Sequence, residues 1–223
     1  LGGGIGGNKD GYNCEQYIGQ DPLAVIAAAQ AASYSYVVNE AEMDAAVAGG
    51  AEKILGLFAP GGKTPEGFRV DSSLPYPEGE PTLAEMTAVA LDVLEEDRDG
   101  FFLVVEGSQI DWSGHDNDMN YLIAEMLGFD EAVREVQEWI NASPRRRMQT
   151  LLVLVGDHET GGMMINGPYG SLSAAGDIVE EGWTSTGHTA QDTLIWSQGP
   201  GSSQLGAALQ NTDLFDAMET VLR

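Results

Sequence analysis

The amino-acid sequence predicts an α/β fold in which parallel strands alternate with crossover helices. Short apolar runs alternate along the chain with segments whose apolar residues recur at helical spacing. Residues typical of helix N-caps precede several of the helical segments, and glycines follow some of them. Such an alternation favours a layered sheet with crossover helices over a β-sandwich.

Capping residues and apolar runs set the boundaries of the predicted elements. Asp21 is expected to cap an Ala-rich helix, and Asn39 a second one. Thr82 and Glu85 form the capping-box pattern of a third helix. The expected elements, in chain order, are a helix at 22–32, a strand at 34–38, a helix at 40–48, a strand at 54–58, a helix at 83–98, a strand at 101–105, a helix at 121–142, strands at 151–155 and 193–196, and a helix at 213–222.

Two further segments are interpreted as loops. Residues 60–81 are rich in Gly, Pro, Ser and Glu, which predicts a long surface loop rather than a domain boundary, because the alternation resumes after it. Arg145, Arg146 and Arg147 follow the longest predicted helix, where positive charge is favourable. We expect a solvated loop there, with an anion site as the alternative. Residues 1–223 are therefore expected to form one domain.

The composition limits the classes of partner. The 35 Asp and Glu residues against 10 Lys and Arg residues give a formal net charge of −25. A polyanion would be repelled, so nucleic acid and anionic membrane surfaces are not expected partners, and no apolar run suits a membrane span. Two interpretations remain open: a generally acidic soluble protein, or a halophilic one whose stability rises with salt because salt screens the carboxylates. Cys14 is the single cysteine, and we interpret it as a free thiol or a small packed residue.

The three histidines of the chain lie beside carboxylates near the ends of predicted strands. Because the carboxyl ends of parallel strands meet at one edge of a sheet, groups far apart in sequence can converge there. Asp157 and His158 follow the strand at 151–155 and offer oxygen and nitrogen ligands for a metal; a polar turn is the alternative. His188 precedes the strand at 193–196, where a lone histidine is more often structural.

The remaining histidine belongs to a cluster that follows the predicted strand at 101–105. Asp111 and His115 are four residues apart, which on a helical turn places a carboxylate oxygen and an imidazole nitrogen on one side, suitable for one zinc. Glu106 leaves the strand five residues before Asp111 and suits an oxygen-preferring cation such as magnesium. A capped helix start with a surface histidine is the alternative.

Several stretches of the sequence resemble a known family. Three stretches of the chain closely resemble, in the same order, the three C-terminal metal-site motifs of the alkaline phosphatases. They are FFLVVEGSQIDWSGHDND, TLLVLVGDHETGGM and TSTGHT. Also similar to that family are PTLAEMT, ILGLF and the initial LGGG, so the resemblance covers essentially the whole chain. It implies a doubly wound, mostly parallel sheet with helices on both faces.

The resemblance assigns site residues and cofactors, namely two Zn²⁺ and one Mg²⁺. The residues that match metal ligands of the family are Asp111, His115 and His188 for the first zinc, Asp157 and His158 for the second zinc, and Glu106 for magnesium. Trp112 matches a position near the phosphate, where an indole donates one hydrogen bond and carries no charge. A purely structural Trp112 is the alternative.

The chain also departs from the family pattern. Family members begin with a strand and a Gly-Asp-Gly turn, then present a serine nucleophile at a helix start and an arginine that clamps phosphate, and none of these motifs occurs here. Ser72 and Ser73 lie in a Pro-rich loop, so neither is assigned as nucleophile. We therefore expect that the N-terminal strands and the nucleophile are missing, that this chain contains no catalytic residue, and that it is inactive alone.

The activity implied by the resemblance is hydrolysis of phosphate monoesters through a phosphoserine intermediate, in partnership with the missing N-terminal half. The alternatives are a related phosphodiesterase, sulfatase or mutase of the same superfamily, or a non-catalytic metal-binding module. A periplasmic or secreted location and a homodimer are expected from the resemblance alone.

Overall fold

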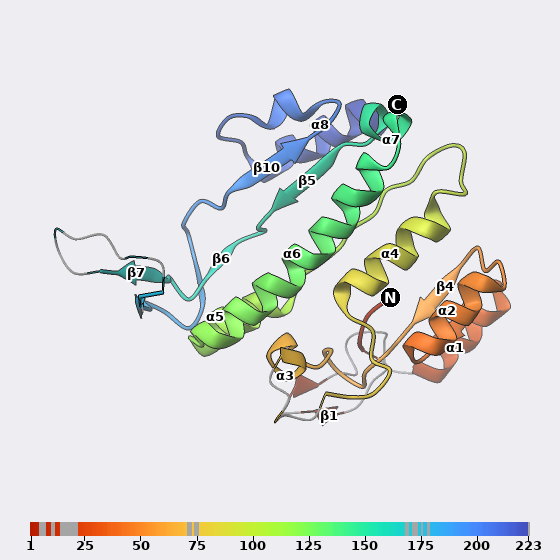
Figure 1. The fold of residues 1–223 in the computed structure, drawn as a ribbon, viewed down its shortest axis with the longest axis horizontal. Helices are drawn as coiled ribbons and strands as arrows, with labels where there is room; N and C mark the ends of the chain where they lie inside the picture. Colours follow the sequence, from red (N-terminus) through yellow and green to blue (C-terminus); the bar gives the residue numbers. More distant parts are fainter. Residues whose placement is uncertain are drawn as a thin grey trace. The chain divides into compact units, whose positions relative to one another are not determined.

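A computed structural model describes residues 1–4, 8–9, 12–13, 22–70, 73, 76–167, 170, 174, 176–177 and 179–222 (Figure 1). Cys14, Asp21 and Ser72, discussed above, lie outside the described residues. The chain divides into two compact units. Unit 1 comprises Leu1–Gln109 and Ile123–Val136, and unit 2 comprises Ile110–Leu122 and Gln137–Arg223.

Unit 1 combines short strands with helices. Its elements are β1 (Asn8–Lys9), β2 (Tyr12–Asn13), α1 (Pro22–Ala31), β3 (Ser35–Val37), α2 (Glu40–Ala48), β4 (Ile54–Gly56), α3 (Glu66–Val70) and α4 (Leu83–Leu94). β3 and β4 pair in parallel, and Gly2 forms an isolated parallel bridge to Leu57. α1 packs against β3, and α2 packs against both strands (Figure 1). The predicted alternation of strands and helices is confirmed in this part of the chain.

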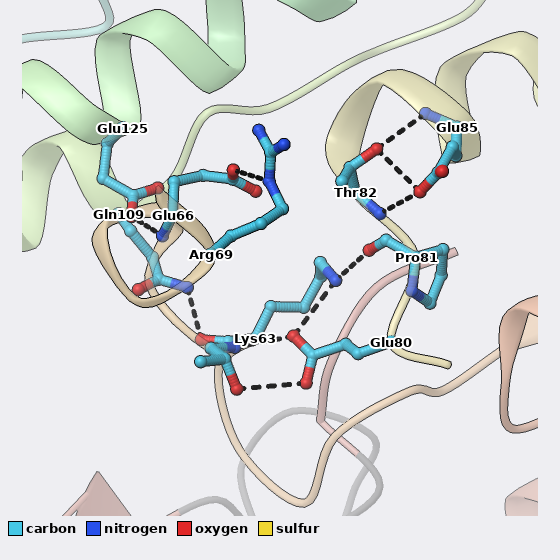
Figure 2. Close-up of polar contacts among 10 residues, drawn as sticks. Lys63, Glu66, Arg69, Glu80, Pro81, Thr82, Glu85, Gln109 and Glu125 are labelled. Carbon is cyan, nitrogen blue, oxygen red and sulfur yellow. Dashed lines mark hydrogen bonds and ion pairs between the residues drawn. The ribbon is translucent and has the colours of Figure 1, made fainter. Parts of the chain in front are cut away.

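Capped helices and an apolar core hold unit 1 together. Asn39 caps α2 as predicted, since its side chain accepts a hydrogen bond from the Glu42 backbone N–H at 2.9 Å. Thr82 and Glu85 form the predicted capping box of α4 (Figure 2). The buried residues that pack together where α2, α4 and β3 meet are Val37, Met43 and Met86. Local capping signals therefore place both helices, and burial of their apolar faces fixes them against the strands.

A buried polar network occupies the segment at residues 60–81 (Figure 2). The Lys63 ammonium forms an ion pair with Glu80 at 3.1 Å and donates to the Pro81 carbonyl. Glu80 also accepts hydrogen bonds from the Thr64 backbone N–H at 2.7 Å and from the Thr64 hydroxyl at 3.1 Å. The Gln109 side-chain amide donates to the Lys63 carbonyl at 2.6 Å. These contacts satisfy polar groups that would otherwise be costly to bury.

The prediction that residues 60–81 form only a loop is wrong, because α3 lies within them. Glu125, on α6 (Met119–Asn141), accepts a hydrogen bond from the Glu66 backbone N–H at 2.7 Å (Figure 2). Gly128, nearly one turn further along α6, allows this approach, since a Cβ there would lie 2.7 Å from the Glu66 side chain. A helix start needs partners for its first N–H groups. The partner of Glu66 lies 59 residues away, so the local composition did not indicate this helix.

Burial raises the pKa of the Glu125 carboxyl to about 7, from its ordinary value of 4.5. The hydrogen bond from the Glu66 backbone and the charge of Lys63 lower this pKa, whereas the negative charge of Glu66 raises it further. At this carboxyl, the folded chain therefore binds more protons than the unfolded chain between pH 4.5 and 7. The free energy of unfolding accordingly falls as the pH rises through that window.

Glu125→Gln is expected to stabilise the chain at pH 8 and to change its stability little at pH 5. The amide oxygen can still accept the Glu66 N–H but carries no charge, which removes a penalty of about 1–3 kcal/mol above the folded pKa. Urea unfolding of wild type and variant at both pH values measures the difference. Glu131→Gln is the control, because Glu131 is the exposed partner of Arg69 at 3.1 Å. If Glu125→Gln changed the free energy of unfolding equally at pH 5 and pH 8, the raised pKa of the Glu125 carboxyl would be contradicted.

Unit 2 is built from antiparallel strand pairs and short helices. Its elements are α5 (Gln109–Asp116), α7 (Pro144–Gln149), β5 (Leu152–Val155), β6 (Glu159–Thr160), β7 (Met164–Asn166), β8 (Glu180–Gly182), β9 (His188–Thr189), β10 (Ile195–Gln198), a 3₁₀ helix (Ser202–Leu205) and α8 (Asn211–Leu222). The pairs are β5–β10, which lie side by side in Figure 1, β6–β9 and β7–β8. The first residue of α5 belongs to unit 1, and α6 contributes to both units. Across the described ranges, no helix has both the length and the apolarity that a membrane crossing needs.

The three consecutive arginines lie in a helix, α7, and not in the solvated loop that we predicted. Ser143 caps this helix by accepting a hydrogen bond from the Arg145 backbone N–H at 3.2 Å. The guanidinium of Arg146 donates to the Trp139 carbonyl at 3.0 Å, near the end of α6. This contact places positive charge at the carbonyls of the helix C-terminus, where such charge is favourable.

The predicted strand at 101–105 is not present, since no β-pairing involves these residues within the described part of the chain. Their solvent exposure does alternate as in a strand: Phe102 and Val104 are 59% and 71% exposed, and residues 101, 103 and 105 are half-buried. An extended segment becomes a strand only when a neighbouring backbone supplies a ladder of hydrogen bonds. Among the described residues the named strands pair two by two, so the mostly parallel, doubly wound sheet remains a prediction.

Candidate metal centre

The structure brings the three histidines together within unit 2: His115 lies on α5, His158 directly before β6, and His188 on β9. β6 and β9 are antiparallel, with Thr160 opposite His188. His158 lies two residues before Thr160, and its ring stacks on that of His188 with centroids 3.6 Å apart. His115, on α5, has its ring centroid 5.1 Å from that of His188. Segments separated by more than 70 residues thus place their imidazoles in one cluster.

The carboxylate of Asp111 lies among these imidazoles. Its Oδ2 is 3.4 Å from His115 Nε2, one helical turn away on α5. Its Oδ1 is 3.4 Å from His188 Nε2 and 3.9 Å from His158 Nδ1. The other ring nitrogen of His158, Nε2, lies 3.2 Å from the exposed carboxylate of Asp157. Five of the six metal ligands predicted from the sequence therefore lie in contact with at least one other member of the set.

Two glycines let α5 approach β6 closely. A Cβ on Gly114 would lie 2.8 Å from the Thr160 carbonyl oxygen. Gly161 has a positive φ of 92°, and a Cβ there would lie 2.6 Å from the Trp183 ring and 2.8 Å from the Gly114 carbonyl oxygen. Larger residues at these two positions would push the helix that carries Asp111 away from the turn that carries His158.

Hydrogen bonding fixes the tautomer of His115. Its Nδ1 lies 2.7 Å from the Thr186 carbonyl oxygen, which only accepts, so Nδ1 carries a hydrogen. In the neutral ring, the lone pair of Nε2 then faces the Asp111 carboxylate at 3.4 Å. Two acceptors this close repel each other unless a cation, either a proton or a metal ion, lies between them. Metal-binding histidines typically donate their other N–H to a carbonyl in this way.

The spacing of the ligand atoms fits zinc. Bonds from zinc to nitrogen and oxygen are about 2.0–2.1 Å long, so ligands at the corners of a tetrahedron lie about 3.3–3.4 Å apart. The distance from Asp111 Oδ2 to His115 Nε2 and that from Asp111 Oδ1 to His188 Nε2 are both 3.4 Å, although they start from the two different oxygens of one carboxylate. The 3.2 Å between Asp157 and His158 is close to the tetrahedral separation. Asp111, His158 and His188 also offer ligand atoms that all lie within 4.8 Å of one another.

Sequence reasoning missed two residues that hold this cluster. Thr160 lies with its hydroxyl oxygen 2.5 Å from Asp111 Oδ1, and Thr186 supplies the carbonyl that binds His115. Each lies two residues from a predicted ligand, in the strings DHET and TGH, and this proximity was the available signal. Glu159, which was not assigned as a ligand, anchors the turn by accepting hydrogen bonds from the backbone of Gly162 at 3.2 Å and from the Thr189 hydroxyl.

The last two predicted site residues lie beside this cluster in sequence. Glu106 is exposed and belongs to unit 1, so its assignment to magnesium rests on the sequence motif. Trp112 follows Asp111 on α5 and is half-buried. Both roles remain predictions.

Comparison with known proteins identifies the family. A family model described as alkaline phosphatase matches residues 6–177. The chain belongs to the alkaline phosphatase family. It is 28% identical to alkaline phosphatase 3 of Bacillus subtilis over 249 residues, which cover 82% of this chain and 51% of that protein. The chain thus spans about half the length of that relative, and the resemblance inferred from the metal-site motifs is confirmed.

Solved alkaline phosphatases share the fold. The cold-active alkaline phosphatase from the psychrophile Shewanella sp. matches 100% of this chain and 65% of its own, with a TM-score of 0.75 and 26% identity. A variant of the TAB5 alkaline phosphatase with Mg bound in its M3 site matches 100% of this chain and 59% of its own, with a TM-score of 0.70 and 24% identity. The predicted α/β class is therefore confirmed.

Proposed function

We propose that this chain supplies the zinc-binding part of an enzyme that hydrolyses phosphate monoesters through a phosphoserine intermediate. The observation that carries the proposal is the Asp111 carboxylate among three imidazoles, in a chain of the alkaline phosphatase family. The proposed cofactors are two zinc ions and one magnesium ion. A periplasmic or secreted location and a homodimer are proposed on family membership alone.

The first zinc is assigned to Asp111, His115 and His188, and the second to Asp157 and His158. The separations of 3.4 Å within the first set support its assignment, as does the hydrogen bond that turns Nε2 of His115 toward Asp111. The separation of 3.2 Å between Asp157 and His158 supports the assignment of the second zinc. Structural zinc sites have four ligands and catalytic sites usually three from the protein, so two residues are too few. The second zinc therefore needs at least one ligand from elsewhere.

When bound, the zinc ions neutralise charge on the transferring phosphoryl group and orient its oxygens. The chain's own residues prepare the site for them. Thr186 holds the His115 ring in one orientation, and Thr160 holds the Asp111 carboxylate. Trp112 is proposed to face the phosphate, where its indole N–H offers a single donor without charge.

Glu106 is proposed as the ligand of magnesium. A carboxylate oxygen suits this hard cation, which prefers oxygen ligands in an octahedral arrangement. Magnesium is bound in the M3 site of the TAB5 variant, which supports a magnesium site in the proposed enzyme. The position of Glu106 in the string EGSQIDWSGH is the basis for choosing this residue.

The serine nucleophile is proposed to come from a segment outside these 223 residues. In the part of the chain that the structure describes, no serine hydroxyl is hydrogen-bonded to any of the three histidines. Ser113, between Asp111 and His115, is fully buried, and its hydroxyl donates to the Ile110 carbonyl at 2.5 Å. The same outside segment is proposed to supply a strand that pairs with residues 101–105. That strand would complete a doubly wound, mostly parallel sheet, and residues 1–223 would then be one part of a single larger domain.

A substrate panel tests the proposed reaction on a version of the protein that includes the serine-bearing segment. We expect hydrolysis of p-nitrophenyl phosphate to exceed that of bis-p-nitrophenyl phosphate and of p-nitrophenyl sulfate, to stop with a chelator, and to return with zinc and magnesium. A preference for the diester or the sulfate would instead favour a related phosphodiesterase or sulfatase. Zinc binding without hydrolysis of any ester would indicate a non-catalytic metal-binding module.

A further inference from the structure

We propose that Thr160 is a positioning residue that couples the two halves of the zinc centre through its hydroxyl group. The inference rests on the proposed function, because the coupling matters only if Asp111 and His158 hold different zinc ions. Thr160 lies between them, with its hydroxyl oxygen 2.5 Å from Asp111 Oδ1 and 3.2 Å from His158 Nδ1.

The direction of the first hydrogen bond follows from chemistry. A hydroxyl has one hydrogen to donate, and an ionised carboxylate only accepts. The hydrogen of Thr160 therefore points to Asp111 Oδ1, and the short distance of 2.5 Å is typical of a hydroxyl bound to a charged oxygen. This bond holds the Asp111 side chain in the orientation that faces His115 and His188.

The direction of the second hydrogen bond then follows. With its hydrogen donated to Asp111, the Thr160 oxygen can only accept from His158, so Nδ1 of His158 carries the hydrogen. The lone pair of this imidazole is left on Nε2, which lies 3.2 Å from Asp157. One hydroxyl thus turns the Asp111 oxygens toward the first zinc and the His158 lone pair toward the second.

The backbone around Thr160 fixes the place of this hydroxyl. Thr160 pairs with His188 across the β6–β9 ladder, and its carbonyl lies against Gly114 of α5. A β-branched side chain has few accessible rotamers, so the hydroxyl cannot swing freely away from its two partners. Serine can supply the same hydroxyl, whereas valine has nearly the same shape as threonine and lacks it.

Thr160→Val is expected to weaken zinc binding about 10–100-fold, the usual effect of removing a group that orients a metal ligand. Thr160→Ser is expected to bind zinc nearly as tightly as wild type. The control is Thr220→Val, which removes a hydroxyl of unit 2 that donates within α8 to the Asp216 carbonyl at 2.8 Å. Competition with a chromogenic chelator measures the affinity of the 223-residue chain for zinc in each variant.

A second measurement tests the hydrogen bond between His158 and the Thr160 hydroxyl directly, in the absence of metal. The measurement uses zinc-free protein that carries Asp157→Ala, because without zinc the Asp157 carboxylate at 3.2 Å would itself favour a hydrogen on Nε2. In this background at alkaline pH, ¹⁵N NMR of the imidazoles is expected to show His158 as the Nδ1–H tautomer with Thr160 and with Thr160→Ser. In Thr160→Val it is expected to shift toward the Nε2–H tautomer that a free imidazole favours. A merely structural role of Thr160 would leave the tautomer unchanged.

The outcomes separate this inference from the proposed function. Zinc affinity of Thr160→Val equal to wild type, or a loss in Thr160→Ser as large as in Thr160→Val, would overturn the coupling and leave the proposed zinc centre standing. An unchanged His158 tautomer in Thr160→Val would overturn it as well. A wild-type chain that binds no zinc would overturn the proposed function, and the coupling with it.

Discussion

The 223-residue chain is expected to hydrolyse p-nitrophenyl phosphate about 10³-fold or more slowly than a version that includes the proposed serine-bearing segment. Covalent catalysis needs a nucleophile beside the group that activates it. Ser113, which lies two residues from both Asp111 and His115, is fully buried, and its hydroxyl donates a hydrogen bond to a backbone carbonyl. The arginine that clamps phosphate in the family is also expected from the sequence motifs to be missing, and without it the substrate would be neither held nor aligned.

The measurement is initial rates at alkaline pH with saturating zinc and magnesium, on both proteins purified in parallel. Zinc content, determined on the same samples, is the control: at least one zinc per chain in both proteins ensures that a slow rate is not mistaken for an empty first site. Comparable rates from the two proteins would contradict the proposal, and would mean that a nucleophile lies within these 223 residues.

Asp111→Ala is expected to remove about one zinc per chain. Its two oxygens contact ring nitrogens of His115 and His188 at 3.4 Å each, so the first zinc loses the ligand that lies between the other two. Only two imidazoles remain there, fewer than the three protein ligands that a catalytic zinc site usually has. Thr160 also loses the acceptor of its hydroxyl, so binding at His158 weakens as well.

Zinc content after exhaustive dialysis, measured by atomic absorption, tests this expectation. Asp216→Ala is the matched control, because Asp216 is an exposed carboxylate on α8 of the same unit. Unchanged zinc content in Asp111→Ala would refute the assignment of the first zinc. An equal loss in both variants would show that zinc binds to carboxylates of the acidic surface and not to this cluster.

The chemistry of the candidate site was predictable from short strings of sequence. Asp111 and His115 are four residues apart on a helical turn, and a helix places such a pair on one side wherever it lies in the fold. The capping box of Thr82 and Glu85 was predictable for the same reason, since both of its hydrogen bonds span three residues. Asp157 is adjacent to His158, but neighbouring side chains point in different directions in a regular strand or helix, so their contact at 3.2 Å also depends on the bend of the backbone there.

The contacts between segments far apart in the chain were decided only by the tertiary structure. The register of β6 on β9 sets Thr160 opposite His188, and no local pattern fixes the register of two-residue strands. The helix α3 forms where Glu125 satisfies a backbone N–H from 59 residues away. Residues 101–105 have the composition of a strand, but pairing depends on a neighbouring backbone. The sequence by itself determined which ligands are present and how residues close together along the chain are spaced. Packing between segments determined which of those ligands come into contact, because a contact between two distant segments depends on the positions of both.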